Sequence, residues 1–320
     1  MDTIPVIIPT LNRYSHLVDC LNSLAECKYA SETDIYISVD YPPEERFFDG
    51  YERVLEYVKG GISGFRNVYI YIQEKNLGVS ENAHFLYNKA FENNDRLIFT
   101  EDDNIFSHNF LEYMIGMMKK YEKDESIYAV TGYRWPFEME KRAESFKSSF
   151  ISAWGCGLWK DRVAAFERFR RDELVRYLKN ATNRKKFRDW SYHVYKQSVY
   201  VACEKHHMQI YRRDTLEKTY RDADFIVEMY MYIRGMQVVV PYVSKVRNMG
   251  HDGSGENCDI DNFSVYNEQK IDDRDYFEDD AVAVDLNENE LKQLRHFHEN
   301  NDNTGIKERI KINLMLAWGM

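Results

Sequence analysis

Residues 97–103 read Leu-Ile-Phe-Thr-Glu-Asp-Asp, an apolar run that ends directly in three acids. The apolar residues predict a buried strand, and the acids mark the point where that strand ends. Similar apolar runs precede it, each followed by apolar residues at helical spacing, at residues 6–8, 35–39 and 68–72. Strands that alternate with helices indicate a parallel sheet with helices on both faces. We therefore predict an α/β fold with a mostly parallel sheet flanked by helices.

The expected helices carry their apolar residues on one face and occupy residues 15–24, 44–59, 80–91 and 107–123. Ser15 is the expected N-cap of the first helix. One face of the fourth helix carries an apolar stripe, which we interpret as core packing rather than a cofactor contact: Phe110, Met114, Met117 and Met118. Residues 127–131 are then expected to return to the sheet.

The composition limits the kinds of partner. The 320 residues include 43 basic and 53 acidic side chains, and the formal net charge is −10. Proteins that follow a nucleic-acid backbone need clustered Lys and Arg, so this balance argues against a nucleic-acid partner. With 44% hydrophobic and 15% aromatic residues the chain is expected to form a packed core. An anionic ligand would be met by a few placed groups or a metal ion.

Two further features indicate the compartment. No apolar run approaches the ~20 residues that span a bilayer, and the first residues lack the pattern of a secretion signal. We therefore expect a cytoplasmic protein. The cysteines are scattered without a close pair, which predicts reduced, buried thiols rather than disulfides or structural zinc: Cys20, Cys27, Cys156, Cys203 and Cys258.

Ligands of parallel sheets bind at the carboxyl ends of the strands. Here those ends are polar and acidic: residues 9–10, Asp40, residues 74–76 and residues 101–103. Neither a dinucleotide-binding glycine motif nor a P-loop is present to hold phosphates. Adjacent carboxylates repel unless a cation lies near them, and their oxygens suit Mg²⁺ or Mn²⁺ shared with substrate phosphates. The alternative is that Asp102 and Asp103 cap a following helix.

Taken in order, several of these segments resemble GT-A glycosyltransferases, particularly family 2-like bacterial enzymes: residues 6–13, Asp40, residues 76–78 with Asn82, and residues 100–103. The acids and the following residues 109–113 are also similar to the DXD-type region of the N-acetylglucosaminyltransferase that starts hybrid and complex N-glycans. Residues 155–159 and the spacing from Asp224 to Pro241 extend this similarity. The resemblance covers about residues 4 to 255 and implies a Rossmann-like GT-A sheet with an acceptor-side C-terminal extension.

The resemblance implies a site for a nucleotide-sugar donor. In it Asp40 would bind the uracil or ribose, and the remaining donor-site residues would be Pro9, Thr10, Asn12, Arg13, Asn76, Gly78, Asn82, Glu101 and Asp102. The structural alternative for Asp40 is a helix cap or a turn residue. Asp103 would ligate Mn²⁺ or Mg²⁺ that bridges the diphosphate. Glu101 stands where a strict DXD motif has aspartate, which leaves open whether this first acid touches sugar, ribose or metal.

An inverting transfer also needs a base on the acceptor side. The family spacing favours Asp224, while Asp222 and Glu228 remain alternatives and Asp189 is a lesser candidate. Asp224 and Glu228 are four residues apart and so share a helix face. An acid in the first turn of a helix is also favoured by the helix dipole alone, which is the structural alternative.

Two further segments have candidate roles. Residues 248–255 contain three glycines with Asn, Asp and Ser, and His251 within them is a candidate metal ligand or diphosphate contact. The acceptor-side candidates are Trp154, Gly155, Gly157 and Trp159, with Trp135 as a further aromatic face. The pair His206-His207 and residues 184–186 would suit an anionic acceptor or a solvated face equally well.

These features predict a metal-dependent inverting glycosyltransferase that moves a sugar from a UDP-sugar to a saccharide or lipid-linked acceptor in bacterial surface polysaccharide assembly. The alternatives are a sugar-phosphate nucleotidyltransferase and a non-catalytic glycan-binding protein. Residues 1–105 would form the nucleotide-sugar half, residues 106–255 the acceptor and catalytic half, and residues 256–320 an extension that starts with an acidic loop or cover. Residues 306–320 predict a packing helix or a peripheral membrane contact at the inner face of the cytoplasmic membrane.

Overall fold

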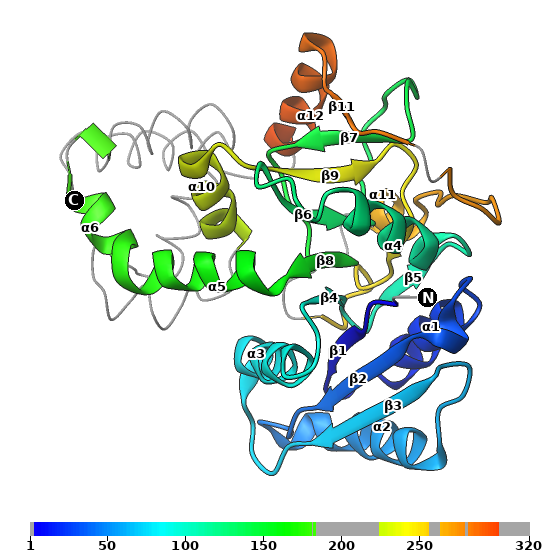
Figure 1. Cartoon of the computed structure of the whole chain (residues 1–320). Coiled ribbons are helices and arrows are strands. Elements are labelled where there is room, and N and C mark those ends of the chain that lie inside the picture. Colours follow the sequence, from blue (N-terminus) through cyan, green and yellow to red (C-terminus); the bar gives the residue numbers. More distant parts are fainter. Residues whose placement is uncertain (1–2, 181, 184–223, 256–262, 279–280, 301–320) are drawn as a thin grey trace. The chain divides into compact units, whose positions relative to one another are not determined.

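The computed structural model in Figure 1 describes residues 3–180, 182–183, 224–255, 263–278 and 281–300. Contacts between α-carbons divide the chain into two compact units. The first unit is assembled from Met1–Pro136, Glu140–Val163 and Gly235–Asp285. The second unit consists of Phe137–Met139, Ala164–Arg234 and Leu286–Met320.

The first unit begins with the predicted alternation of strands and helices. Its elements are β1 (Val6–Thr10), α1 (Tyr14–Ala25), β2 (Asp34–Val39), α2 (Phe48–Gly60), β3 (Asn67–Ile72), α3 (Gly78–Phe91) and β4 (Arg96–Phe99). The predicted N-cap of α1 is wrong, because the helix already includes Tyr14 and its cap position is Arg13. The predicted strands and helices themselves are confirmed. Apolar runs and helical spacing are the strongest local signals of secondary structure, which explains why they could be predicted.

The rest of the first unit contains shorter elements. They are β5 (Asn104–Phe106), α4 (Phe110–Lys120), β6 (Ile127–Thr131), β7 (Ser145–Ser148), β8 (Cys156–Trp159), β9 (Gln237–Pro241), β10 (Val246–Asn248), α11 (Phe263–Asn267) and β11 (Val284–Asp285). The return of residues 127–131 to the sheet is confirmed. Phe110, Met114, Met117 and Met118 of α4 are buried, which confirms the core interpretation of that face.

Among the described residues the strands form one large sheet and one small one. The large sheet has the order β11-β7-β9-β6-β8-β4-β1-β2-β3, and β5 pairs with β10 separately. Neighbours are parallel at β1–β2, β1–β4, β2–β3, β6–β9 and β7–β11, and antiparallel where β8 meets β4 and β6 and where β7 meets β9. The prediction of an α/β fold with a mostly parallel sheet is confirmed, and Figure 1 shows helices beside this sheet.

A buried ionic network fixes part of the acidic segment that follows Gly255. Lys245 forms an ion pair with Asp272, and their side chains are only 1% and 3% exposed. Arg274 pairs with Asp272 at 2.7 Å and with Glu144 at 2.6 Å. Burial opposes the charge on Asp272, but hydrogen bonds from Arg274 and Lys245 outweigh it and lower the pKa of Asp272 well below its usual value. The described part of the segment thus consists of a short helix, α11, and irregular chain that is held in place by these ion pairs.

The second unit is helical in its described part. It contains the part of helix α5 (Lys160–Arg168) from Ala164 on, a π-helical turn (Phe169–Glu173), α6 (Leu174–Lys179), α10 (Asp224–Arg234) and α12 (Glu288–Asn300). Phe169 packs against Tyr230 of α10 with ring centroids 5.1 Å apart. No helix in the described ranges is long and apolar enough to cross a membrane. Residues 306–320, Cys203 and Cys258 lie outside the described residues, whereas Cys20, Cys27 and Cys156 are buried thiols outside any disulfide, as predicted.

Candidate active site

Parallel pairing brings four strand ends to one edge of the sheet. Strands β4, β1, β2 and β3 are neighbours with the same direction, so the polar residues after them meet. Thr10, at the end of β1, donates from its Oγ1 to Asp102 Oδ2 at 2.6 Å. Its carbonyl accepts a hydrogen bond from the backbone N–H of Asp40 at 2.9 Å. Thr10 therefore links the acids after β4 to the acid after β2.

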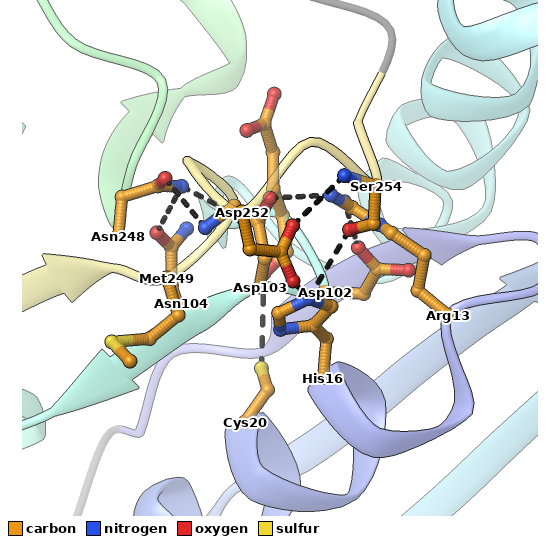
Figure 2. A network of polar contacts seen from close by, with 12 residues as sticks. Arg13, His16, Cys20, Asp102, Asp103, Asn104, Asn248, Met249, Asp252 and Ser254 are labelled. Carbon is orange, nitrogen blue, oxygen red and sulfur yellow. Dashed lines mark hydrogen bonds and ion pairs between the residues drawn. The ribbon is translucent and has the colours of Figure 1, made fainter. Parts of the chain in front are cut away.

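Arg13 holds the two aspartates of the acidic triplet (Figure 2). Its Nη1 donates to Asp103 Oδ2 at 2.7 Å, and its Nη2 donates to Asp102 Oδ1. The carboxylates are 2% and 4% exposed, and the Arg13 side chain is 20% exposed. The alternative that Asp102 and Asp103 cap a helix is wrong, because strand β5 follows them directly.

Burial and crowding of like charges shift the titration of this cluster. Burial, and then the charge of Asp103, raise the pKa of Glu101 to about 8, although a hydrogen bond from Trp154 opposes the shift. Burial also raises the pKa of Asp103, against the effect of Arg13. Burial disfavours the charge on Arg13, but Asp102 and Asp103 outweigh it and raise the pKa of Arg13. The cluster is therefore an acidic site whose negative charge is partly offset by the Arg13 guanidinium.

The small sheet brings a distant loop to the acids. Because β5 pairs with β10 in antiparallel register, Asn248 lies opposite Asn104. Asn248 Nδ2 donates to Asp103 Oδ1 at 2.8 Å, and the Met249 N–H donates to the Asp103 carbonyl at 2.8 Å. A Cβ on Gly250 would overlap Asp103 Oδ2, so any larger residue there would displace the loop or the carboxylate. The glycine-containing segment thus packs on Asp103.

His251 lies in an aromatic setting next to this contact. It is buried and stacks on Tyr266 of α11, with ring centroids 4.0 Å apart and an interplanar angle of 9°. The Trp154 ring meets His251 edge-on at 6.1 Å. Trp154 Nε1 also donates to Glu101 Oε2 at 2.8 Å. Residues predicted for the metal, the donor and the acceptor are therefore brought together around Glu101 and Asp103.

Three residues at the start of α1, its cap Arg13 and the helix residues His16 and Cys20, face the same cluster. Arg13, His16 and Cys20 are spaced by three and four residues, so one side of the helix start carries all of them. His16 Nε2 lies 3.0 Å from Asp252 Oδ2 and 3.3 Å from Ser254 Oγ, which joins α1 to the loop after β10 (Figure 2). The buried Cys20 thiol donates to the Glu101 carbonyl at 3.7 Å. Sequence reasoning did not single out His16, Cys20 or Tyr266; the spacing from Arg13 is the signal that points to the first two.

The other donor-site candidates lie along the same edge. Pro9 pairs in register with Ser38 at the end of the β1–β2 ladder. The Asn12 carbonyl lies against Gly50 of α2, where a Cβ would overlap it. Asn76 Nδ2 donates to Asp40 Oδ2 at 3.2 Å and the Gly78 N–H donates to the same oxygen at 2.9 Å. The buried Asn82 instead donates to the Ser38 carbonyl at 3.2 Å, which ties α3 to β2.

The acceptor-side candidates separate into two groups. Cys156, at the start of β8, is paired with Phe99, so Trp154 and Gly155 precede β8 at the edge that carries the acids. Trp159 is paired with Arg96 at the other end of β4, and the structure does not bring it to the cluster. Gly157 lies within β8, where a Cβ would overlap Met118 of α4, so it allows close packing in the core.

The candidate bases belong to the second unit. Asp224 is the first residue of α10, and Glu228, one turn later, is buried. Asp222, Asp189, residues 184–186 and the pair His206-His207 lie outside the described residues. The first unit is therefore the part in which the candidate site is built.

Asp103 and His251 are the candidate ligands for the divalent metal ion that the fold implies. The described residues contain no group of three or more His, Cys, Asp or Glu arranged to hold an ion. Mg²⁺ and Mn²⁺ in phosphate-transfer sites commonly take one or two carboxylates, with substrate phosphates and waters as the other ligands. Asp103 beside the His251 loop fits such a shared site, because hard oxygen donors dominate and few protein ligands are required.

The sheet carries an acidic triplet, an arginine and a glycine-containing loop at its strand ends. This arrangement is typical of GT-A glycosyltransferases. The sequence profile of glycosyl transferase family 2 matches residues 6–219, which is more than half of the chain. The chain belongs to this family.

Solved structures show weaker likeness. Mannosyltransferase PcManGT from Pyrobaculum calidifontis, in complex with GDP-Man and Mn²⁺, is 11% identical with a TM-score of 0.36 over 50% of this chain and 45% of that one. TarS 1–349 of S. aureus is 16% identical with a TM-score of 0.38, over 57% of this chain and 52% of that one. The same TarS fragment in complex with UDP is 10% identical with a TM-score of 0.40, over 98% of this chain and 70% of that one. The chain thus covers about half of the length of the first two of these structures, and no curated protein matches it in sequence.

Proposed function

We propose that this family 2 protein is a glycosyltransferase that moves a sugar from a nucleotide diphosphate donor, a UDP-sugar, to a saccharide acceptor with inversion at the anomeric carbon. The observation that carries the proposal is the cluster of Arg13, Asp102 and Asp103 at the strand ends of a family 2 domain. In an acidic protein a cation at the site can offset the repulsion between the carboxylates and a diphosphate. Arg13 and a divalent ion would supply that positive charge.

The donor would lie along the strand-end edge. Asp103 and His251 would hold Mn²⁺ or Mg²⁺, with diphosphate oxygens completing the coordination. A bound ion would offset the negative charge that develops on the departing nucleoside diphosphate. Arg13 keeps Asp102 and Asp103 oriented before the donor arrives, and Asn248 and Gly250 hold Asp103 from the other side.

The acceptor would approach from the side of Trp154, whose indole N–H orients Glu101. Asp224 is the proposed base that removes the proton of the attacking hydroxyl, with Asp222 and Glu228 as the alternatives. In this proposal residues 1–105 carry the donor half, residues 106–255 the acceptor half and residues 256–320 an extension. The transferred sugar would be a hexose or N-acetylhexosamine, as in the N-acetylglucosaminyltransferase that the motifs resemble. The setting would be bacterial surface polysaccharide assembly at the inner face of the cytoplasmic membrane.

The test measures donor hydrolysis and transfer over a panel of nucleotide sugars, with Mn²⁺ and with EDTA. Asp103→Ala should abolish both reactions because the metal site is lost. Asp224→Asn should retain donor binding and lose turnover by at least about 100-fold, because only the base is removed. Asp161→Asn changes an exposed acid in the first turn of α5, so it serves as the matched acid-to-amide control and should keep turnover. Full activity in EDTA and in both variants would exclude the proposal, and pyrophosphate release from a nucleoside triphosphate would indicate a nucleotidyltransferase instead.

A further inference from the structure

Strand β3 forms an edge of the large sheet. Within the described ranges it pairs with β2 on one side and with no strand on the other (Figure 1). It reads Asn-Val-Tyr-Ile-Tyr-Ile, without proline or a charged residue. Soluble proteins commonly protect such an edge with charges, proline or a bulge, because its backbone groups are a template for another strand. Here Tyr69 and Ile72 are instead 40% and 42% exposed.

The pairing with β2 shows which backbone groups of β3 face outward. Successive residues of a strand direct their N–H and C=O groups to opposite sides, so alternate residues face the same neighbour. The Gln73 N–H donates to the Val39 carbonyl at 3.0 Å, so Gln73 faces β2. Tyr69 and Tyr71, four and two residues earlier, face β2 as well. The backbone groups directed to the open side are those of Val68, Ile70 and Ile72.

The side chains of β3 differ in kind between the two faces of the sheet. Alternate side chains of a strand point to opposite faces. On one face Tyr69 packs on Tyr36 of β2, with ring centroids 4.6 Å apart. On the same face Tyr71 meets Phe85 of α3 edge-on, with centroids 5.2 Å apart. The other face carries only aliphatic side chains of β3: Val68, Ile70 and Ile72.

A second copy of β3 fits this edge when it runs antiparallel about a twofold axis through Ile70. A twofold axis brings the same surface of both copies together. Ile70 then lies opposite Ile70 of the second copy, Val68 opposite Ile72, and Tyr69 opposite Tyr71. The residues with outward backbone groups become the hydrogen-bonded pairs of an antiparallel ladder. Aliphatic side chains meet aliphatic ones and tyrosine meets tyrosine.

Charges beside the two ends of β3 are complementary in the same register. Arg66 precedes the strand and Glu74 follows it, and both are exposed. Each is four residues from Ile70, so the axis brings Arg66 of one copy opposite Glu74 of the other. Arg66 already pairs with Asp34 at 2.6 Å, but its side chain remains 50% exposed. Opposite charges on paired strands stabilise the pairing, whereas like charges weaken it.

We propose that the chain forms a homodimer in which β3 pairs antiparallel with β3 of a second copy about a twofold axis through Ile70. The backbone groups, the aliphatic face, the tyrosine face and the end charges all match in this one register, which favours a second copy over an unrelated strand. Two six-residue strands form a small contact beside a standard interface of about 1,600 Å², so the dimer should be weak, with a Kd on the order of 10 µM. The dimer is independent of the proposed function, because it involves neither the acidic triplet nor a nucleotide.

Sedimentation velocity of the full chain tests the dimer. The parent chain should change from monomer to dimer between about 1 and about 200 µM, a range that brackets the expected Kd. Ile72→Lys should raise the dimer Kd by at least about tenfold, because lysine on an edge strand opposes pairing and is tolerated by the fold. Val282→Lys is the matched control at a 60% exposed position beside β11, the opposite end of the sheet order, and should keep the parent Kd. A parent chain that stays monomeric throughout would overturn the proposal.

A charge reversal tests the register. Glu74→Arg places like charges opposite one another at both ends of the paired strands, and it should raise the dimer Kd by about threefold to tenfold at low salt and by less at high salt. The control is Glu125→Arg, an exposed position before β6, which β8, β4, β1 and β2 separate from β3 in the sheet order. If Ile72→Lys does not fold, Glu74→Arg decides, since it changes an exposed side chain outside the strand. A Kd unchanged by Glu74→Arg would overturn the register through Ile70.

Amide exchange followed by NMR at low and high protein concentration locates the contact. In the dimer the N–H groups of Val68, Ile70 and Ile72 become hydrogen-bonded, so their exchange should slow by about tenfold or more as the dimer forms. The N–H groups of Tyr69 and Tyr71 already point to β2 and should change less. A dimer in which exchange at Val68, Ile70 and Ile72 does not slow uses another surface, and that result would overturn the proposal.

Discussion

At the scale of single residues, Arg13 is the cation on which two buried carboxylates depend. Removing one member of a buried ion pair leaves an uncompensated charge, which costs more than the pair contributes. Arg13→Gln is therefore expected to lower the free energy of unfolding by about 3 kcal/mol, measured by urea denaturation at pH 7. Arg13→Lys should cost less, about 1–2 kcal/mol, because it keeps the charge but cannot span both carboxylates.

The matched control is Arg46→Gln. Arg46 pairs with Glu44 at 3.0 Å, but the two side chains are 70% and 60% exposed. Such exposed pairs contribute at most about 1 kcal/mol, so the same substitution should be nearly neutral there. Equal stability of Arg13→Gln and the parent chain would contradict the role of Arg13 as the counter-ion of the acidic triplet.

Glu101 gives the site a pH dependence of defined sign. Its ordinary pKa of 4.5 rises to about 8 in the folded chain, so between these values the folded state binds more protons than the unfolded state. Stability should then fall as pH rises from about 5 to about 8. Glu101→Gln cannot ionise, and it should be more stable than the parent chain at pH 8.5 by at least about 1 kcal/mol while matching it near pH 5.

This comparison is made by urea unfolding in EDTA across the pH range, so that no ion stabilises the carboxylates. The glutamine retains an oxygen for the Trp154 N–H, which preserves that hydrogen bond. Burial raises the pKa of Asp103 as well, so its contribution has the same sign and a residual slope should remain. Parallel pH profiles for Glu101→Gln and the parent chain would rule out a raised pKa at Glu101.

At the scale of elements, the pairing of β5 with β10 is what joins residues 101–103 to residues 248–254. Gly250 lies so close to Asp103 Oδ2 that a methyl group has no room. Gly250→Ala should push the loop or the carboxylate aside and weaken donor binding by about tenfold or more, with the fold retained. Calorimetry with UDP and Mg²⁺ checks the affinity, and circular dichroism checks the fold.

The control for this change is Gly60→Ala, which adds the same methyl group in open space. It should leave the affinity unchanged. If Gly250→Ala binds UDP as tightly as the parent chain, then the contact between the loop and Asp103 has no part in donor binding, and the proposed position of the donor is wrong.

The elements also show what the sequence could predict. Strands β1 to β3 were predictable because each is a mostly apolar run followed by a helix, and β4 because its apolar run ends directly in three acids. Strands β5 and β7 were not, because β5 has three residues, β7 reads Ser-Phe-Lys-Ser, and their pairing partners lie far away in the chain. In the site, the acids and the loop 248–255 were recognisable from composition. The contacts of Arg13 with Asp102 and Asp103 were not, because they join residues about ninety positions apart.

At the scale of the whole molecule, the net charge of −10 opposes the binding of the proposed diphosphate donor. The candidate site adds a negative cluster of its own, of which Arg13 offsets only part. A nucleoside diphosphate therefore enters unfavourably unless a divalent cation enters with it. Conversely, a free cation has few protein ligands there, since the described residues offer no three-ligand group. Cation and nucleotide should each bind weakly alone and strengthen one another.

This mutual dependence predicts a thermal-shift pattern. UDP alone and Mn²⁺ alone should each raise the Tm by about 1 °C or less, whereas both together at about 100 times the Kd should stabilise by about 2.7 kcal/mol and raise the Tm by about 5 °C. EDTA should cancel the joint effect. Asp103→Asn should lose it as well, because the variant keeps the shape of the side chain but supplies a weaker ligand to the ion. A full shift with UDP in EDTA would show that Arg13 alone carries the diphosphate and that the cation is dispensable for binding.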